Sequence, residues 1–177
     1  MEEIEIPIEK LQEDIHHEIE HGHDSTGFMM KGALLSAVLA VFAAICALMA
    51  GHYSNEALIE QLSASNAWAY YQAKGIKSSI TEIKLMVSPK DAEPLKEKMA
   101  EYKQQQEEIK KEAEEKQEES RHHLSKHQAL ASAVTFFQIA IALTAISVLT
   151  RKRRFMGGSL VLGIIGALMM ARGLWLI

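Results

Sequence analysis

Three long apolar segments constrain this chain more than any other feature of its sequence. Residues 33–50 and 129–150 contain no charged side chain, and residues 155–177 contain only Arg172. A helix of about 20 apolar residues spans a hydrocarbon core of about 30 Å. The sequence therefore predicts three transmembrane helices, at residues 28–53, 129–150 and 155–177, and the lipid bilayer as a partner.

The rest of the chain points to an all-α fold. The sequence has three prolines and lacks the alternation of β-branched and polar residues that is typical of strands. Its single cysteine, Cys46, cannot form an intramolecular disulfide. The formal net charge of −4 leaves no basic face for nucleic acid. We therefore expect a helical membrane protein that binds neither nucleic acid nor a cofactor.

A basic loop predicts how the chain is oriented. The sequence Arg-Lys-Arg-Arg at residues 151–154 separates the second and third apolar segments. Short loops rich in Lys and Arg stay in the cytoplasm. This places residues 151–154 and the N-terminus inside, and residues 54–128 and the C-terminus outside.

Residues 54–128 are expected to form two helical arms around a tip near residues 88–94. Asp91 is a favourable N-cap for the returning arm, with Pro94 in its first turn. Both arms show a heptad pattern, with residues at alternating steps of three and four that are apolar toward the tip and more polar toward the apolar segments. On the first arm these are Ile59, Leu62, Asn66, Ala69, Ala73, Ile76, Ile80, Ile83 and Val87; on the second they are Leu95, Met99, Tyr102, Gln106, Ile109, Ala113, Lys116, Ser120, His123 and His127. This repeat predicts an antiparallel coiled-coil hairpin whose arms wrap around each other or around neighbours.

Aromatic side chains on the first arm suggest contact with other copies of the chain. Trp68, Tyr70 and Tyr71 cannot all face one partner helix, and exposed aromatics are typical of interfaces. Two interpretations stand, which are local packing across the hairpin and a homo-oligomer interface. We favour the homo-oligomer because the seam nearest the apolar segments is polar on the second arm.

A ridge of small residues on the third apolar segment is assigned to the same interface. Ser159, Gly163 and Ala167 recur every four residues. Such a ridge lets two membrane helices approach closely.

Histidines give two candidate sites. His52, Asn55, His123 and His127 are expected to meet at the membrane end of the hairpin. There they form either a pH-sensitive polar layer or simple headgroup contacts.

The acidic segment at residues 1–27 contains an amphipathic helix and a linker that includes Gly22. Its acidic polar face favours a protein partner over a membrane surface. Within it, residues 17–21 match the H-E-x-x-H pattern. A protease would also need a third ligand and a walled cleft, so we expect no enzyme. His17 and His21 remain candidate metal ligands, and the alternative is a solvated helix face.

Two stretches resemble a known family. Gly51-His52-Tyr53-Ser54-Asn55-Glu56-Ala57 and Trp68-Ala69-Tyr70-Tyr71-Gln72-Ala73-Lys74-Gly75-Ile76-Lys77 are similar to a bacterial membrane-protein family designated domain of unknown function 4337. The resemblance extends over nearly the whole chain. It implies a protein of the bacterial inner membrane. Together with the orientation predicted from the basic loop, this places the hairpin and the C-terminus in the periplasm. The resemblance implies no catalytic residue.

Together these features predict a non-enzymatic membrane protein that self-assembles through coiled-coil hairpins in a structural or scaffolding role. The alternatives are a small oligomeric channel or transport-accessory subunit, and a membrane sensor that responds to metal or pH.

Overall fold

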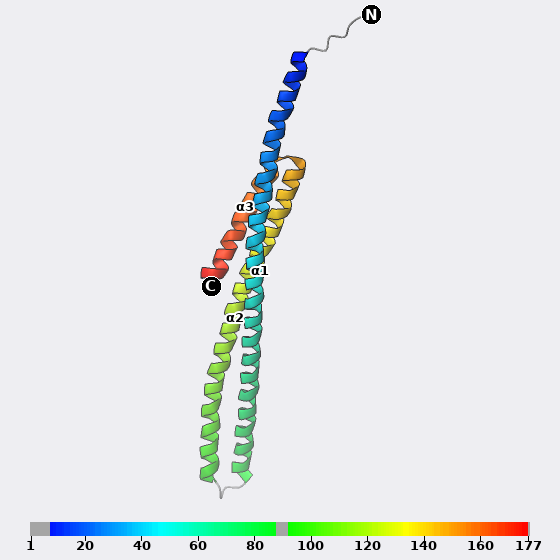
Figure 1. Cartoon of the computed structure of the whole chain (residues 1–177). Helices are drawn as coiled ribbons and strands as arrows, with labels where there is room; N and C mark the ends of the chain where they lie inside the picture. The colour runs from blue at the N-terminus through cyan, green and yellow to red at the C-terminus, as the bar shows by residue number, and fades with distance from the viewer. Residues whose placement is uncertain (1–7, 88–91, 177) are drawn as a thin grey trace, which may run out of the picture. The chain divides into compact units, whose positions relative to one another are not determined.

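The structure, a computed structural model, describes the backbone of residues 8–87 and 92–176 and the side chains of residues 26–87 and 92–175. The elements are α1 (Ile8–Val87), α2 (Ala92–Thr150), α3 (Arg153–Ala171) and a short π-helical turn, η2 (Arg172–Leu176) (Figure 1). The expected all-α class is confirmed over the described residues. Each of the three long helices contains a stretch that is long and apolar enough to cross a membrane.

The first helix is longer than the sequence suggested. We expected a linker before residue 28, but α1 runs without a break from Ile8 to Val87 and includes Gly22 and Gly27. A glycine inside a helix costs about 1 kcal/mol relative to alanine, which is too little to end a helix of this length. At the other end, Pro94 lies in the first turn of α2 as expected. Asp91, the expected N-cap, lies outside the described residues.

A two-residue turn joins α2 to α3. The sequence suggested a loop over residues 151–154, whereas α3 already begins at Arg153. Arg151 has a φ of 54°, in the left-handed region that helices and strands avoid. The Ser147 hydroxyl and the Phe155 amide both donate hydrogen bonds to the Lys152 carbonyl, at 3.1 and 3.2 Å. These bonds hold the chain reversal between the two helices.

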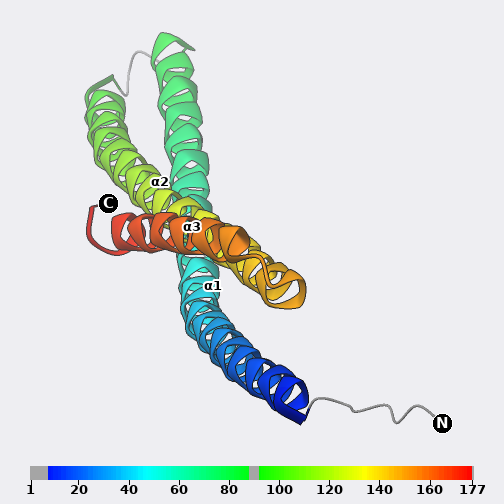
Figure 2. The same ribbon diagram turned by 90° about the horizontal axis from the view of Figure 1, so that it is seen from above.

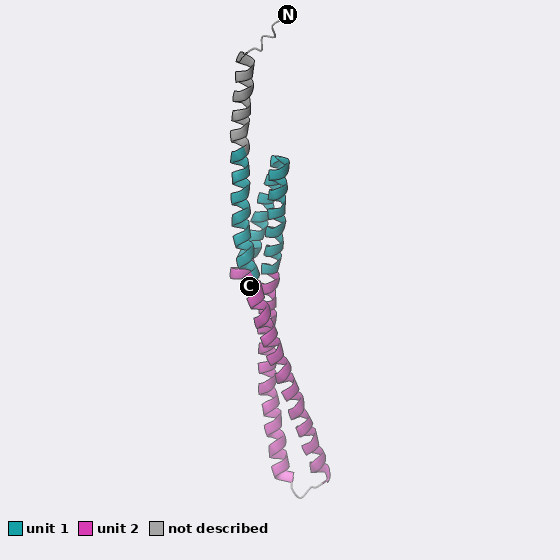
Figure 3. Cartoon of the chain, turned by 45° about the vertical axis from the view of Figure 1, so that its right-hand side comes forward, with its two compact units in different colours: residues 1–47, 130–171 teal, residues 48–129, 172–177 magenta. Residues whose placement is uncertain are grey.

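The chain divides into two compact units (Figure 3). Unit 1 comprises Met1–Ala47 and Leu130–Ala171, and unit 2 comprises Leu48–Ala129 and Arg172–Ile177. In unit 1, Phe137 is fully buried and its ring centroid lies 6.0 Å from that of Phe42. The buried Ser159 hydroxyl donates to the Ala140 carbonyl at 2.8 Å, which ties α3 to α2.

The small residues of α3 pack inside unit 1. A Cβ on Gly166 would lie 2.9 Å from the Phe137 ring, and one on Gly163 would lie 3.1 Å from Leu39. Ser159 is fully buried, whereas Ala167 is exposed. Of the three α3 residues assigned to an oligomer interface, the structure thus places Ser159 and Gly163 against the chain's own helices.

In unit 2, the C-terminal half of α1 and the N-terminal half of α2 lie side by side, as both views show (Figures 1 and 2). We call residues 48–87 and 92–129 the helix pair. Its core contains Ala67, Ile109 and Ala113, with Trp68 and Tyr71 packed against them. The candidate site lies on this helix pair.

Candidate functional site

The α1 side of the helix pair contacts α2 through a face of small residues. This small-residue face comprises Ala57, Ala64, Ala67, Ser78 and Thr81, all of them buried. They recur at heptad spacing, as residues that face one partner helix do. Small side chains let the α2 side chains reach the α1 backbone.

Three polar side chains of α2 use this access. The Ser120 hydroxyl donates to the Ala57 carbonyl at 2.8 Å, and the Gln106 amide donates to the Tyr71 carbonyl at 3.2 Å. His127 Nδ1 lies 2.8 Å from the Ala50 carbonyl oxygen. A buried polar group needs such a partner. These three polar side chains of the α2 seam therefore find their partners on α1 within the same chain.

Gly75 lies directly beside the Gln106 side chain of this contact. A Cβ built on Gly75 would lie 2.8 Å from Gln106 Nε2. The glycine therefore leaves the room in which the Gln106 amide reaches the Tyr71 carbonyl. This gives a structural reason for the glycine that follows Tyr-Tyr-Gln-Ala-Lys in the sequence.

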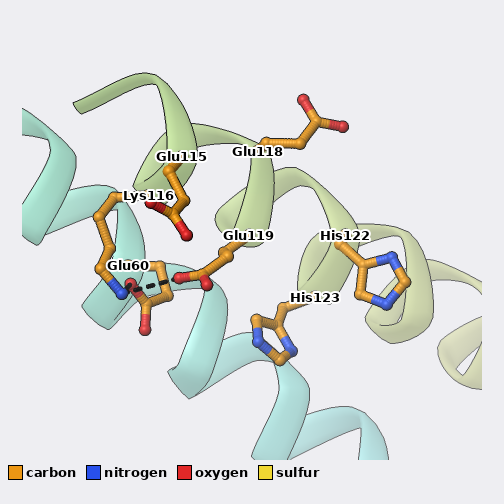
Figure 4. A pocket seen from close by; sticks show the side chains of 7 residues that line it. All are labelled: Glu60, Glu115, Lys116, Glu118, Glu119, His122 and His123. Carbon is orange, nitrogen blue, oxygen red and sulfur yellow. Dashed lines mark hydrogen bonds and ion pairs between the residues drawn. The ribbon is translucent and has the colours of Figure 1, made fainter. Parts of the chain in front are cut away.

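A second set of contacts in the helix pair is charged (Figure 4). This charged layer comprises Lys116 and Glu119 on α2 and Glu60 on α1. The Lys116 ammonium lies 2.8 Å from Glu119 on its own helix and 3.1 Å from Glu60 on α1. These hydrogen bonds, to Glu119 first and then to Glu60, raise the pKa of Lys116. The bond from Lys116 also lowers the pKa of Glu119. Lys116 and Glu119 therefore stay charged at neutral pH, and the ion pair between Lys116 and Glu60 links the two helices.

A shallow hollow of about 660 Å³ opens beside this layer. It is lined by Glu60, Glu115, Lys116, Glu118, Glu119, His122 and His123 (Figure 4). His123 Nδ1 is buried without a hydrogen-bond partner among the described residues, and its ring stacks on Tyr53 at 6.0 Å. The Lys116 ammonium is held by two carboxylates, so it has no lone pair for nucleophilic chemistry. The charged layer can therefore hold α1 and α2 together, but it offers no nucleophile.

The four residues expected to form a polar layer all lie in unit 2. The His52 and His123 rings both contact the Tyr53 ring, with centroids 5.4 and 6.0 Å from it. His127 contacts the Ala50 carbonyl, and Asn55 is exposed. Sequence reasoning missed Tyr53, which joins the two histidine rings.

The aromatic residues of α1 divide between two faces. Trp68 and Tyr71 pack against the core of the helix pair, and their rings meet edge to face at 5.6 Å. Tyr70 is exposed, with the Lys74 ammonium 5.0 Å above its ring. Local packing, one of the two interpretations kept from the sequence, therefore describes Trp68 and Tyr71. Tyr70 is the most exposed of the three, and the same Lys74 ammonium lies 5.6 Å from the Tyr102 ring on α2.

Of the two arrangements predicted for the first arm, packing of its repeat against the second arm is wrong. The residues predicted to face α2 lie instead on the exposed face of α1; this outer stripe comprises Ile59, Leu62, Asn66, Ala69, Ala73, Ile76, Ile80, Ile83 and Val87. Their large apolar members expose 48 to 76% of their surface. The second arm does face α1 with its expected residues, such as Ile109, Ala113 and Ser120. Two heptad faces therefore exist on α1, and only the small-residue face is covered within the chain.

The candidate metal ligands of the N-terminus, His17 and His21, lie outside the described side chains. Among residues 26–87 and 92–175, no group of three or more His, Cys, Asp or Glu side chains is arranged to hold a metal ion. The charged layer has a lysine at its centre, which is a poor surrounding for a cation.

A family model described as "Domain of unknown function (DUF4337)" matches residues 28–176. The match spans the helix pair and all three apolar segments, so the chain belongs to this family. No curated protein and no solved structure matches the sequence.

Proposed function

We propose that this member of the DUF4337 family is a non-enzymatic, membrane-anchored structural protein that self-assembles through its helix pair. The outer stripe is the observation that carries the proposal. Ile76, Ile83 and Val87 expose 60 to 76% of their surface although they lie far from the apolar segments in sequence. Burying about 100 Å² of apolar surface contributes roughly 2.5 kcal/mol. A second protein surface offers that gain where no lipid is available.

The interior of the helix pair supports the same proposal. Its buried residues are mostly alanines, serines and threonines, which bury little apolar area. A pair of helices held by such a seam gains stability when neighbours cover its apolar outer face. In this proposal the coiled coil predicted from the sequence forms between chains, and α1 provides its surface.

The apolar parts of α1, α2 and α3 serve as anchors in this proposal. The basic turn at residues 151–154 supports an orientation with that turn in the cytoplasm and the helix pair on the far side. For a bacterial inner membrane, the helix pair would then lie in the periplasm. In copies inserted with one orientation, the α1 helices run parallel and their outer stripes lie at the same height above the membrane, which favours assembly.

The experiment is the mass of the detergent-solubilised protein, by light scattering or native mass spectrometry. We expect a homo-oligomer. Ile76→Glu should reduce it to monomers, because a charge would be buried in the stripe, while the helical content of the chain stays the same. Gln61→Glu places a charge on an exposed residue of α1 outside the stripe and should leave the mass unchanged. A monomeric parent protein would contradict the proposal.

A further inference from the structure

The outer stripe is shaped for another helix. Its residues alternate steps of three and four from Ile59 to Val87, which is an average repeat of 3.5. Such a repeat keeps one line of side chains facing a helix that coils around it. The a positions are Ile59, Asn66, Ala73, Ile80 and Val87, and the d positions are Leu62, Ala69, Ile76 and Ile83. β-Branched residues at a with leucine at d favour two parallel strands, whereas isoleucine at both positions favours three or more, so the single polar residue at an a position, Asn66, decides the number.

Asn66 indicates which side chain the other helix places opposite it. It is exposed in the single chain and occupies an a position among apolar neighbours. Covering the stripe would bury its amide, which is costly unless the partner supplies a hydrogen bond. A carboxamide both donates and accepts, so two asparagines at the same height satisfy each other. A second copy in parallel and in register provides that match, whereas an antiparallel copy centred on Ala73 would place Ile80 near Asn66.

The residues beside the stripe are compatible with a parallel pair. In this arrangement each g position lies near the e position five residues further along the other helix. The resulting neighbours are Ser65 with Tyr70, Gln72 with Lys77 and Ser79 with Lys84. Each pair contains at most one charge, so no like charges meet across the seam.

We infer that the outer stripe is a parallel, in-register seam between two copies of this chain, in which the two Asn66 side chains hydrogen-bond each other. The inference rests on the proposed self-assembly and adds to it the orientation, the register and the number of copies. The two α1 helices lie at the centre of the dimer, and each α2 packs on the outer side of its own α1. Asn66 sets the register, as a buried polar residue at an a position does in coiled coils.

Cysteine cross-linking of the full chain in membranes tests this arrangement. Cys46 is fully buried, and Cys46→Ser gives a background without thiols. Ala69→Cys then places one thiol at a d position, and Gln61→Cys places one on an exposed residue outside the stripe. On mild oxidation, Ala69→Cys should form a disulfide-linked dimer at least about tenfold faster than Gln61→Cys, because only the first pair of Cα atoms lies within disulfide range.

The outcomes separate this inference from the proposed function. A monomeric mass for the parent protein overturns both. An oligomeric mass with no faster cross-linking of Ala69→Cys overturns the parallel seam and leaves self-assembly standing. An antiparallel seam is shown if a mixture of Leu62→Cys and Ile83→Cys links the two variants to each other and neither to itself; that result also overturns the inference.

Asn66→Val tests the paired amides. We expect tighter assembly, with a dissociation constant lower by roughly tenfold or more, because two valines replace a polar pair in an apolar seam. We also expect a less uniform number of chains, since the register determinant is lost. Gln61→Val makes the same kind of change outside the stripe and should alter neither quantity. An Asn66→Val protein with the parent's dissociation constant and chain number would overturn the role of Asn66.

Discussion

Ser120 on α2 donates a 2.8 Å hydrogen bond to the backbone carbonyl of Ala57 on α1. A side chain reaches a carbonyl of a neighbouring helix only where the intervening side chains are small. The bond therefore explains why α1 turns its small-residue face, and not its large apolar residues, toward α2. It also explains why the outer stripe remains exposed.

The first prediction concerns this close approach. Ala64 is 1% exposed, and Ala64→Leu would add three carbons where α2 lies against α1. Overpacking of this kind costs about 1–3 kcal/mol of the free energy of unfolding. Chemical denaturation followed by circular dichroism measures the loss. Ala69→Leu makes the same change on the outer stripe and should leave the single chain equally stable while strengthening its assembly. An equal loss in both variants would contradict the assigned faces.

The second prediction is that the helix pair becomes less stable at acidic pH. The pKa of Glu119 lies below its ordinary value of 4.5 because Lys116 donates a hydrogen bond to it. The resulting stabilisation is present above pH 4.5 and is lost as the pH falls through the lowered pKa. The pKa of Lys116 is raised from 10.5, so its contribution is fully present below pH 10.5. Stability from this layer should thus be constant across neutral pH.

Thermal unfolding at a series of pH values measures the effect. Glu119→Gln should lower the melting temperature at neutral pH and should reduce its fall on acidification. Glu118→Gln is the matched control, because Glu118 is exposed and its ion pair among the described residues is with Arg121, one turn away on its own helix. If both variants follow the parent's acid profile, the charged layer does not stabilise the helix pair.

The third prediction separates the aromatic residues. Trp68 is half-buried against Ile109 and Ala113, so Trp68→Ala should lower the free energy of unfolding by about 2 kcal/mol, less than for a fully buried tryptophan. Tyr70 is 53% exposed, and Tyr70→Ala should change the stability of the single chain by no more than about 0.5 kcal/mol. Urea unfolding of both variants tests the difference. A larger loss from Tyr70→Ala would show that the two rings have been assigned to the wrong faces.

These contacts show which parts of the structure follow from the sequence. The helices, the apolar stretches and the α2 seam follow from hydrophobic spacing, because each presents one clear pattern. The register of α1 does not follow, because Ile76 and Ile83 mark one heptad face and Ala64 and Ala67 mark another. If the face with the larger apolar side chains is expected to turn toward α2, the first face is chosen. The hydrogen bonds that the polar residues of α2 require select the second.

The charged layer and Gly75 were missed for a related reason. Neither Glu60 nor Lys116 stands out in a sequence with many charges, and their pairing depends on which face of α1 turns inward. The spacing of the small residues between Ala57 and Thr81 was the available signal. A search for the heptad face that leaves room for α2 polar side chains would have found it.

The last prediction concerns α3. Gly166 is buried, and a Cβ there would lie 2.9 Å from two atoms of the Phe137 ring. Phe137 is itself 1% exposed and stacks on Phe42, so its ring has little room to move. Gly166→Ala should therefore destabilise unit 1, in spite of the gain of up to about 1 kcal/mol that alanine gives a helix. Thermal unfolding in detergent measures the net change.

Gly157→Ala is the control on the same helix. A Cβ on Gly157 meets nothing within 4 Å, so only the helix-propensity gain applies and the melting temperature should stay equal or rise. The two variants add the same methyl group to one helix and differ only in what it meets. If Gly166→Ala is as stable as Gly157→Ala, then α3 does not pack on α2 through Gly166. The assignment of Ser159 and Gly163 to contacts within the chain would then have to be revised as well.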